Sequence, residues 1–152
     1  MTLDQEVDIL RRIPLFANIE PAKLKLMAFA SERMTYRDGQ AVVRQGEQGD
    51  SAYVILEGEA DVVVDTAGGP LKVANLGRND IVGDIAILID VPRTATVTAR
   101  GELITLKLTK DLFFQLVNDF PEMAVEVMRV LATRLEQTTA ALREARAGNG
   151  AA

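Results

Sequence analysis

The most constraining feature of this sequence is a series of glycines that divides its middle half into short apolar runs. From about residue 33 to residue 109, Gly recurs at short intervals, often beside Asp or Asn, and the intervening segments are rich in Val and Ile. Short β-branched runs separated by turn residues are typical of strands joined by tight connections. The spacing therefore predicts a sandwich, roll or barrel for this zone.

Two adjacent runs in this zone, residues 51–57 and 59–65, are separated only by Gly58. A glycine between two apolar runs is typical of a tight turn, so we predict a hairpin here. Further strands are predicted over residues 71–76, 95–99 and 103–108.

Helical periodicity flanks the strands on both sides. Residues 1–32 form the N-terminal helical zone, which Pro14 and Pro21 divide into pieces. At the C-terminal end a short helix is expected over 111–117, and Pro121 opens a long one. The sequence thus predicts one α+β domain over residues 1–146, followed by a disordered tail of small and polar residues over 147–152. Within the domain, residues 1–32 are expected to be helical, 33–109 to form strands and 110–146 to form two helices.

The predicted long helix carries a heptad pattern. Seven apolar or small residues alternate steps of four and three, which is the spacing of a coiled-coil seam. We expect this seam either to form a homodimer or to pack on the roll of its own chain. Its members are Ala124, Met128, Leu131, Leu135, Thr138, Leu142 and Ala145.

Composition excludes several kinds of site. The 152 residues include no Cys, His or Trp, which removes disulfides, thiol nucleophiles, His-based triads and imidazole metal sites. We therefore expect no enzyme, no metal and no cofactor. The net charge of −5 argues against direct DNA binding, and no apolar run approaches membrane-helix length. With no secretory leader in the acidic N-terminus, a cytoplasmic protein is expected.

One segment, residues 82–97, combines features suited to an anion. Gly83 permits close backbone approach, and the apolar run that follows, Asp84–Ile89, is either a buried strand or one and a half turns of helix. If it is helical, its N-terminus attracts a phosphate. Arg93 follows Pro92, and its guanidinium could bind two phosphate oxygens.

This segment resembles the phosphate-binding cassette of the cyclic nucleotide-binding domain family, which includes the bacterial catabolite activator protein and the regulatory subunits of cyclic-AMP-dependent kinase. Glycine-containing motifs at 38–39, 44–47, 49–50 and 57–58 are similar to the family's roll, and the likeness covers about residues 13–146. The resemblance implies an antiparallel β-roll, jelly-roll-like (a double-stranded β-helix), with an N-terminal helical segment and two C-terminal helices.

The resemblance also implies a role for each site residue. Asp84 stands where the family's Glu accepts the ribose 2′-hydroxyl, and Val82 where many members have Phe. Gly83 and the N–H groups of Ile85 and Ala86 would line the phosphate, Arg93 would pair with it, and Thr94 and Ala95 would complete those contacts. Thr138 and Thr139 fall where the catabolite activator protein presents two hydroxyl residues to adenine.

The implied function is a cyclic nucleotide sensor whose C-terminal helices rearrange on binding. Thr94 resembles the hydroxyl that cyclic-GMP-selective domains use, whereas Thr138 and Thr139 favour cyclic AMP, which we prefer.

The alternative is a nucleotide-blind interaction module that retains the roll. A cupin-like enzyme is disfavoured by the absence of His, and a carboxylate-pair hydrolase is supported only by the abundance of Asp and Glu. A downstream protein partner is expected, and the chain is interpreted as a stand-alone sensor or a piece of a larger protein.

Overall fold

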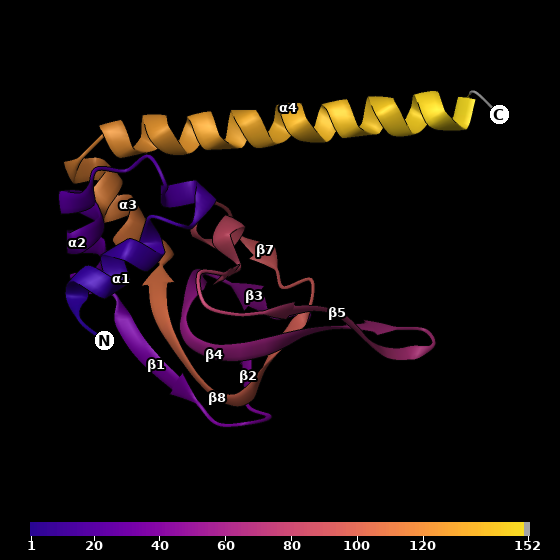
Figure 1. Cartoon of the computed structure of the whole chain (residues 1–152), viewed down its shortest axis with the longest axis horizontal. Coiled ribbons are helices and arrows are strands. Elements are labelled where there is room, and N and C mark those ends of the chain that lie inside the picture. Colours follow the sequence, from indigo (N-terminus) through magenta and orange to yellow (C-terminus); the bar gives the residue numbers. More distant parts are fainter. Residues whose placement is uncertain (151–152) are drawn as a thin grey trace.

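The computed structural model of the chain describes residues 1–150. Helices gather at one end of a β-roll, and the last helix runs past the roll as a long straight rod (Figure 1). The helical elements are α1 (Leu3–Leu10), η1 (Pro14–Phe16), α2 (Pro21–Ala30), η2 (Asp84–Ile87), α3 (Lys110–Asp119) and α4 (Glu122–Gly150). The strands are β1 (Glu32–Tyr36), β2 (Ala41–Val43), β3 (Gln48–Gly49), β4 (Ser51–Thr66), β5 (Gly69–Leu76), β6 (Ile81–Val82), β7 (Val91–Pro92) and β8 (Thr96–Thr109).

Two long antiparallel strands, β4 and β8, form the axis of the roll. Their register runs from Ser51 opposite Thr109 to Val63 opposite Thr96. The main sheet has the order β1-β8-β4-β5, with β2 added to β8 and β6 added to β4, and β3 pairs with β7 separately. This arrangement confirms the predicted α+β fold with an antiparallel core between N-terminal and C-terminal helices.

The hairpin predicted at Gly58 is wrong. Gly58 lies inside the continuous strand β4 with a φ of +92°, at a place where the register with β8 shifts. A Cβ atom there would overlap the carbonyl oxygen of Glu102 on the facing strand, so glycine serves close strand approach and a bend. The turn between β4 and β5 instead follows Thr66. The two strands predicted over 95–99 and 103–108 are likewise one strand, β8, with Gly101 at φ +74°.

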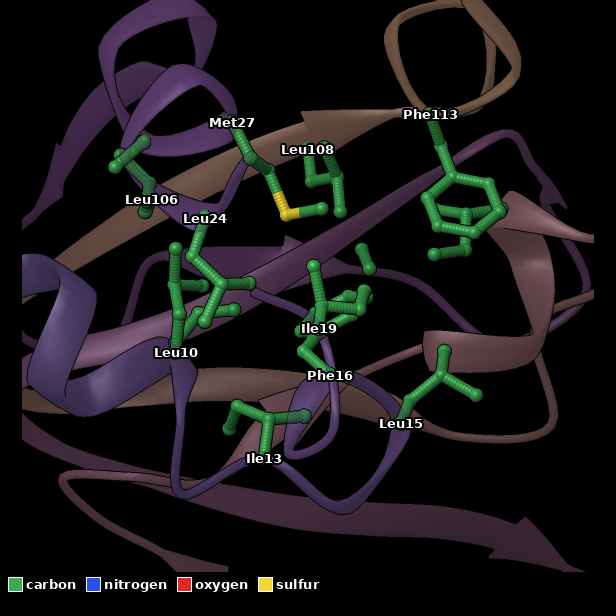
Figure 2. Close-up of a cluster of buried hydrophobic side chains, with 14 of the residues drawn as sticks. Leu10, Ile13, Leu15, Phe16, Ile19, Leu24, Met27, Leu106, Leu108 and Phe113 are labelled. Carbon is green, nitrogen blue, oxygen red and sulfur yellow. The ribbon is translucent and has the colours of Figure 1, made fainter. Parts of the chain in front are cut away.

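The main core lies between the helices and the roll (Figure 2). Phe16 and Phe113 meet there with ring centroids 6.4 Å apart, and Leu24 and Met27 of α2 pack in the same cluster. Ile87 of η2 belongs to this cluster too. The short turn after Gly83 is therefore anchored to the helical end of the molecule.

The C-terminal helices begin where the sequence predicts. The Thr109 hydroxyl accepts a hydrogen bond from Leu112 N and caps α3. Helix α4 continues to Gly150, so the prediction of a disordered tail from residue 147 is wrong for 147–150; residues 151–152 lie outside the described part of the chain. Glycine disfavours a helix interior by about 1 kcal/mol but keeps its N–H group, so it does not break the helix as proline does.

None of the helices within residues 1–150 has the length and apolar character needed to cross a bilayer.

Candidate functional site

The turn after β6 is built around Gly83. Val82 is buried and pairs with Tyr53 of β4, which fixes the start of the turn. Gly83 adopts a left-handed conformation, with φ 72° and ψ 39°, and η2 begins immediately after it. The structure therefore resolves the open alternative for Asp84–Ile89 in favour of a short helical turn, of the 3-10 type over its first four residues.

Arg93 lies against this turn, although β7 and a loop separate the two along the chain. Its backbone is fixed on both sides, since Arg93 N donates to Glu47 O at 2.8 Å and Gly46 N donates to Arg93 O at 2.8 Å. Its side chain is half-buried, and Nη2 donates to the carbonyl oxygen of Ser51 at 2.7 Å. The guanidinium is thus held in one place by contacts with its own chain.

Two glycines form the walls around this guanidinium. A Cβ atom on Gly49 would overlap Nε and Cζ of Arg93, and a Cβ atom on Gly83 would overlap Nη1. Any side chain at either position would therefore displace the arginine. We call the group Gly49, Ser51, Gly83 and Arg93 the arginine cradle.

The backbone N–H groups of η2 are partly used within the turn. Ala86 N donates to Gly83 O at 3.0 Å, and Leu88 N donates to Ile85 O at 2.9 Å. The N–H group of Ala86, predicted to face a phosphate, is therefore engaged inside η2 in this structure. Arg93 is accordingly the strongest anion-binding group beside Gly83, because a guanidinium carries five donors and a full charge.

Asp84 is the first residue of η2 and reaches the long helix. Its Oδ2 atom lies 3.2 Å from Nη2 of Arg134, in α4. The Asp84 side chain is 22% exposed and that of Arg134 41%. The carboxylate beside the cradle is therefore paired with a cation from a segment 50 residues away.

The remaining predicted residues are spread over two places. Thr94 is exposed and Ala95 half-buried, directly after Arg93 and close to the cradle along the chain. Thr138 and Thr139 lie on α4, about one turn beyond Arg134, and the Thr138 hydroxyl donates to Arg134 O at 2.9 Å. Thr138 is exposed and Thr139 half-buried. The structure thus brings Gly83 and Arg93 together. The two threonines lie on α4, and Thr138 is linked to this region through Arg134, which pairs with Asp84.

Three site residues were not predicted from the sequence as part of this site. Gly49 was assigned only to a turn, Ser51 contributes a backbone carbonyl, and Arg134 lies in a different zone. The only local indication for Arg134 is its position four residues before Thr138, which places both on one helix face.

Chemically, the cradle offers a fixed cation beside a paired carboxylate. The cation suits an anion, and a carboxylate accepts hydroxyl groups. The described residues contain no cluster of three or more acidic side chains arranged to hold a metal. The arrangement is therefore suited to holding a small anion that also carries hydroxyl groups.

Comparisons with known proteins match this chain to one domain family. The family model for the cyclic nucleotide-binding domain matches residues 33–120, which include the roll, the cradle and α3. A cAMP-dependent protein kinase regulatory subunit from Blastocladiella emersonii is 37% identical over 109 residues, covering 71% of this chain and 27% of that protein. The chain spans about a quarter of the length of the curated relatives it matches.

Solved structures share the fold. The N-terminal domain of a transcriptional regulator from Streptomyces coelicolor A3(2) superposes with a TM-score of 0.83 at 30% identity, covering 86% of this chain and 94% of that one. The catabolite activator protein of Thermus thermophilus superposes with a TM-score of 0.72 at 25% identity, covering 88% of this chain and 63% of that one.

Proposed function

The chain belongs to the cyclic nucleotide-binding domain family, and on that premise we propose that it is a non-catalytic sensor that binds cyclic AMP in preference to cyclic GMP at the arginine cradle. The observation that supports this most directly is the guanidinium of Arg93, held between Gly49 and Gly83. Both glycines leave the space that the arginine occupies, and Gly83 also allows the left-handed backbone of the turn. A guanidinium held in one place beside this turn is suited to binding a phosphate.

The cyclic phosphate would bind to Arg93. Nη2 already donates to Ser51 O, which leaves the other guanidinium donors for phosphate oxygens. Charge-assisted hydrogen bonds of this kind contribute about 1.5–3 kcal/mol each. Because the arginine is held in place before the ligand arrives, little side-chain entropy would be lost on binding. Gly83, Ile85 and Ala86 on one side, with Thr94 and Ala95 on the other, would surround the phosphate.

The sugar would bind to Asp84, which is adjacent to Gly83 in η2. A carboxylate has about four lone-pair positions, so it can accept from a sugar hydroxyl while paired with Arg134. Val82 is buried against β4 and would support this turn rather than contact the ligand.

The base would be covered by α4, where Thr138 and Thr139 would supply hydroxyl groups to adenine. The relatives named cAMP-dependent kinase regulatory subunits support cyclic AMP as the ligand. Thr138 is exposed in this structure, and we propose that a movement of α4 brings it over the base. Ligand binding would then favour the closed arrangement of the helix, and a downstream protein would recognise the difference.

The exposed heptad residues of α4 support the proposal of a homodimer. Met128, Leu135 and Leu142 repeat at heptad spacing and are 59%, 67% and 61% exposed. Isolated helices are marginal in water unless an apolar face is packed. A second copy of the same helix offers a matching seam.

Isothermal titration calorimetry with cyclic AMP and cyclic GMP tests the ligand. We expect the parent protein to bind both, cyclic AMP more tightly. Arg93→Ala should weaken binding by about 2–5 kcal/mol, or roughly 30-fold or more, because it removes one partner of a charge pair. Arg37→Ala is the matched control, since the Arg37 side chain is exposed at a turn outside the cradle. No heat with either nucleotide would instead support the nucleotide-blind interaction module.

A further inference from the structure

A cavity that shares no residue with the arginine cradle is formed by α1 and the turn that joins β5 to β6. Its volume is about 380 Å³, which is within the range of small-molecule sites in proteins. Three charged side chains line it: Asp8 of α1, Arg12 just after that helix, and Arg78 of the turn. The side chains of Gln5 and Asn79 add amide groups to the same lining.

The turn that carries Arg78 has a fixed backbone. Gly77 N donates to Asp80 Oδ2 at 2.8 Å, and Asn79 N donates to the carbonyl oxygen of Ile55 in β4 at 3.2 Å. Among residues 1–150, Asn79 is the only residue other than glycine with a positive φ, of 76°. That conformation is unfavourable for an L residue, so it persists only where the surrounding structure fixes it. The turn therefore presents its side chains to the cavity from one position.

Arg78 is itself held in place before any ligand binds. Its Nε atom donates to the carbonyl oxygen of Leu56 in β4 at 3.0 Å, which leaves the terminal nitrogens as donors. A cation just after a helix is favourable for that helix, so Arg12 alone indicates no ligand. Arg78 has no such explanation, because it comes from a different element and lines the same cavity.

The charges in this cavity are not paired within the described chain. None of the ion pairs formed among residues 1–150 includes Asp8, Arg12 or Arg78. The lining side chains thus supply two cations and one anion, on a chain whose net charge is −5. A simple dianion would satisfy the arginines but would be repelled by Asp8. A molecule with two anionic groups and one cationic group complements all three side chains.

We propose that this cavity binds a free acidic amino acid, aspartate or glutamate. Arg12 and Arg78 bind its two carboxylates, and Asp8 binds its ammonium group. Gln5 and Asn79 supply further hydrogen bonds; the Oε1 atom of Gln5 is engaged in capping α1, which leaves its NH₂ group as a donor. This site goes beyond the proposed function, because it takes a ligand of another chemical class at another place in the fold.

NMR titration of the isotope-labelled full chain with L-aspartate and L-glutamate tests the site, because it reports where a ligand binds as well as how tightly. We expect at least one of the two to shift the amide signals of Asp8, Arg12 and Asn79 in a saturable manner. Succinate and glutarate lack the ammonium group, and asparagine and glutamine lack the second carboxylate. Each should bind at least about 10-fold more weakly than the matching acidic amino acid.

Two variants and a control separate the site from the fold. Arg12→Ala removes an exposed side chain, so the fold should persist while the affinity falls at least about 10-fold. Asp8→Asn should remove the preference for the amino acid over its dicarboxylate, because the charge that pairs with the ammonium group is gone. Arg37→Ala, which removes an exposed arginine at a turn of the roll, should bind as the parent does.

The inference is overturned by the absence of a saturable shift with either amino acid. Equal affinity for the amino acid and its dicarboxylate would also overturn it, since Asp8 would then recognise nothing. Binding that Arg12→Ala leaves unchanged would place the ligand elsewhere and overturn it as well. Each of these results leaves the proposed function intact, because cyclic nucleotide binding is measured separately at Arg93.

Discussion

Gly83 and Arg93 lie so close together that a Cβ atom on residue 83 would overlap Nη1 of the arginine. The same glycine has a φ of +72°, a conformation that L side chains rarely adopt. Two independent physical reasons therefore require glycine here: the backbone conformation, and the space taken by the cation. Position 83 is for that reason the most sensitive place at which to test the cradle.

Gly83→Ala should abolish most nucleotide binding, with a loss at least as large as the roughly 30-fold expected for removing a charge partner, because the methyl group displaces Arg93. It should also lower the free energy of unfolding by about 1–2 kcal/mol through the left-handed backbone. Calorimetry and urea unfolding measure the two effects separately.

Gly77→Ala is the control for this change. Gly77 has an ordinary φ, and no atom of the described residues lies within 4 Å of its Cβ position. It should bind nucleotide as the parent does. Parent-like affinity in Gly83→Ala would contradict the cradle as the binding site.

The zones of the fold were predictable because their evidence is local. Helical spacing, Pro21 and the glycine-separated Val and Ile runs all act over a few residues. Gly58 was misread because a glycine between two apolar runs predicts a turn, whereas pairing with β8, more than 30 residues later, keeps β4 extended through it. Long-range strand pairing decides between a turn and a bulge, and a single sequence does not show that pairing.

The same distinction applies to the site. Gly83, Asp84 and Arg93 lie within eleven residues, so their spacing identified them together. Gly49 and Arg134 meet those residues only through β3–β7 pairing and the path of α4. Their contribution depends on tertiary structure, and no local pattern distinguishes Gly49 from the other turn glycines.

Gly58 of β4 and Gly101 of β8 give a prediction on stability. Gly58→Ala places a methyl group against the carbonyl oxygen of Glu102, and its φ of +92° adds strain. Gly101→Ala meets only backbone strain, because no described atom lies within 4 Å of its Cβ position. We expect Gly101→Ala to lower the free energy of unfolding by about 1–2 kcal/mol, and Gly58→Ala to lower it by at least about 1 kcal/mol more. Urea unfolding of both variants measures the difference, and equal costs would argue against close strand contact at Gly58.

The α4 seam gives a prediction on assembly. Light scattering of the parent should give twice the 16.5 kDa chain mass, and Leu135→Glu should give the chain mass itself, because it places like charges in the seam. Ala140→Glu adds the same charge at an exposed position outside the heptad seam and should remain dimeric. A monomeric parent would rule out the dimer, and a dimeric Leu135→Glu would place the interface elsewhere.

The start of α4 is held by Lys23 of α2, and this contact is expected to depend on pH. Lys23 Nζ pairs with Glu122, lies 2.9 Å from Glu20 and sits 5.2 Å from the centroid of the Phe120 ring. The hydrogen bond from Lys23 holds the pKa of the Glu122 carboxyl below its ordinary value, and the hydrogen bonds to Glu122 and then Glu20 raise the pKa of Lys23.

Because the folded-state pKa of Glu122 is lowered, its contribution to stability is present above the unfolded pKa and is lost as pH falls through the folded one. The first turn of α4 should therefore loosen in acid, where Glu122 is protonated, and in strong alkali, where Lys23 loses its proton. Lys23→Met should move the pKa of Glu122 back up toward its ordinary value, as measured by NMR titration of the side-chain carboxyl. Lys25→Met, an exposed change on the same helix, should leave that pKa where the parent has it. An unchanged Glu122 pKa in Lys23→Met would show that the ion pair does not hold the start of α4 in solution.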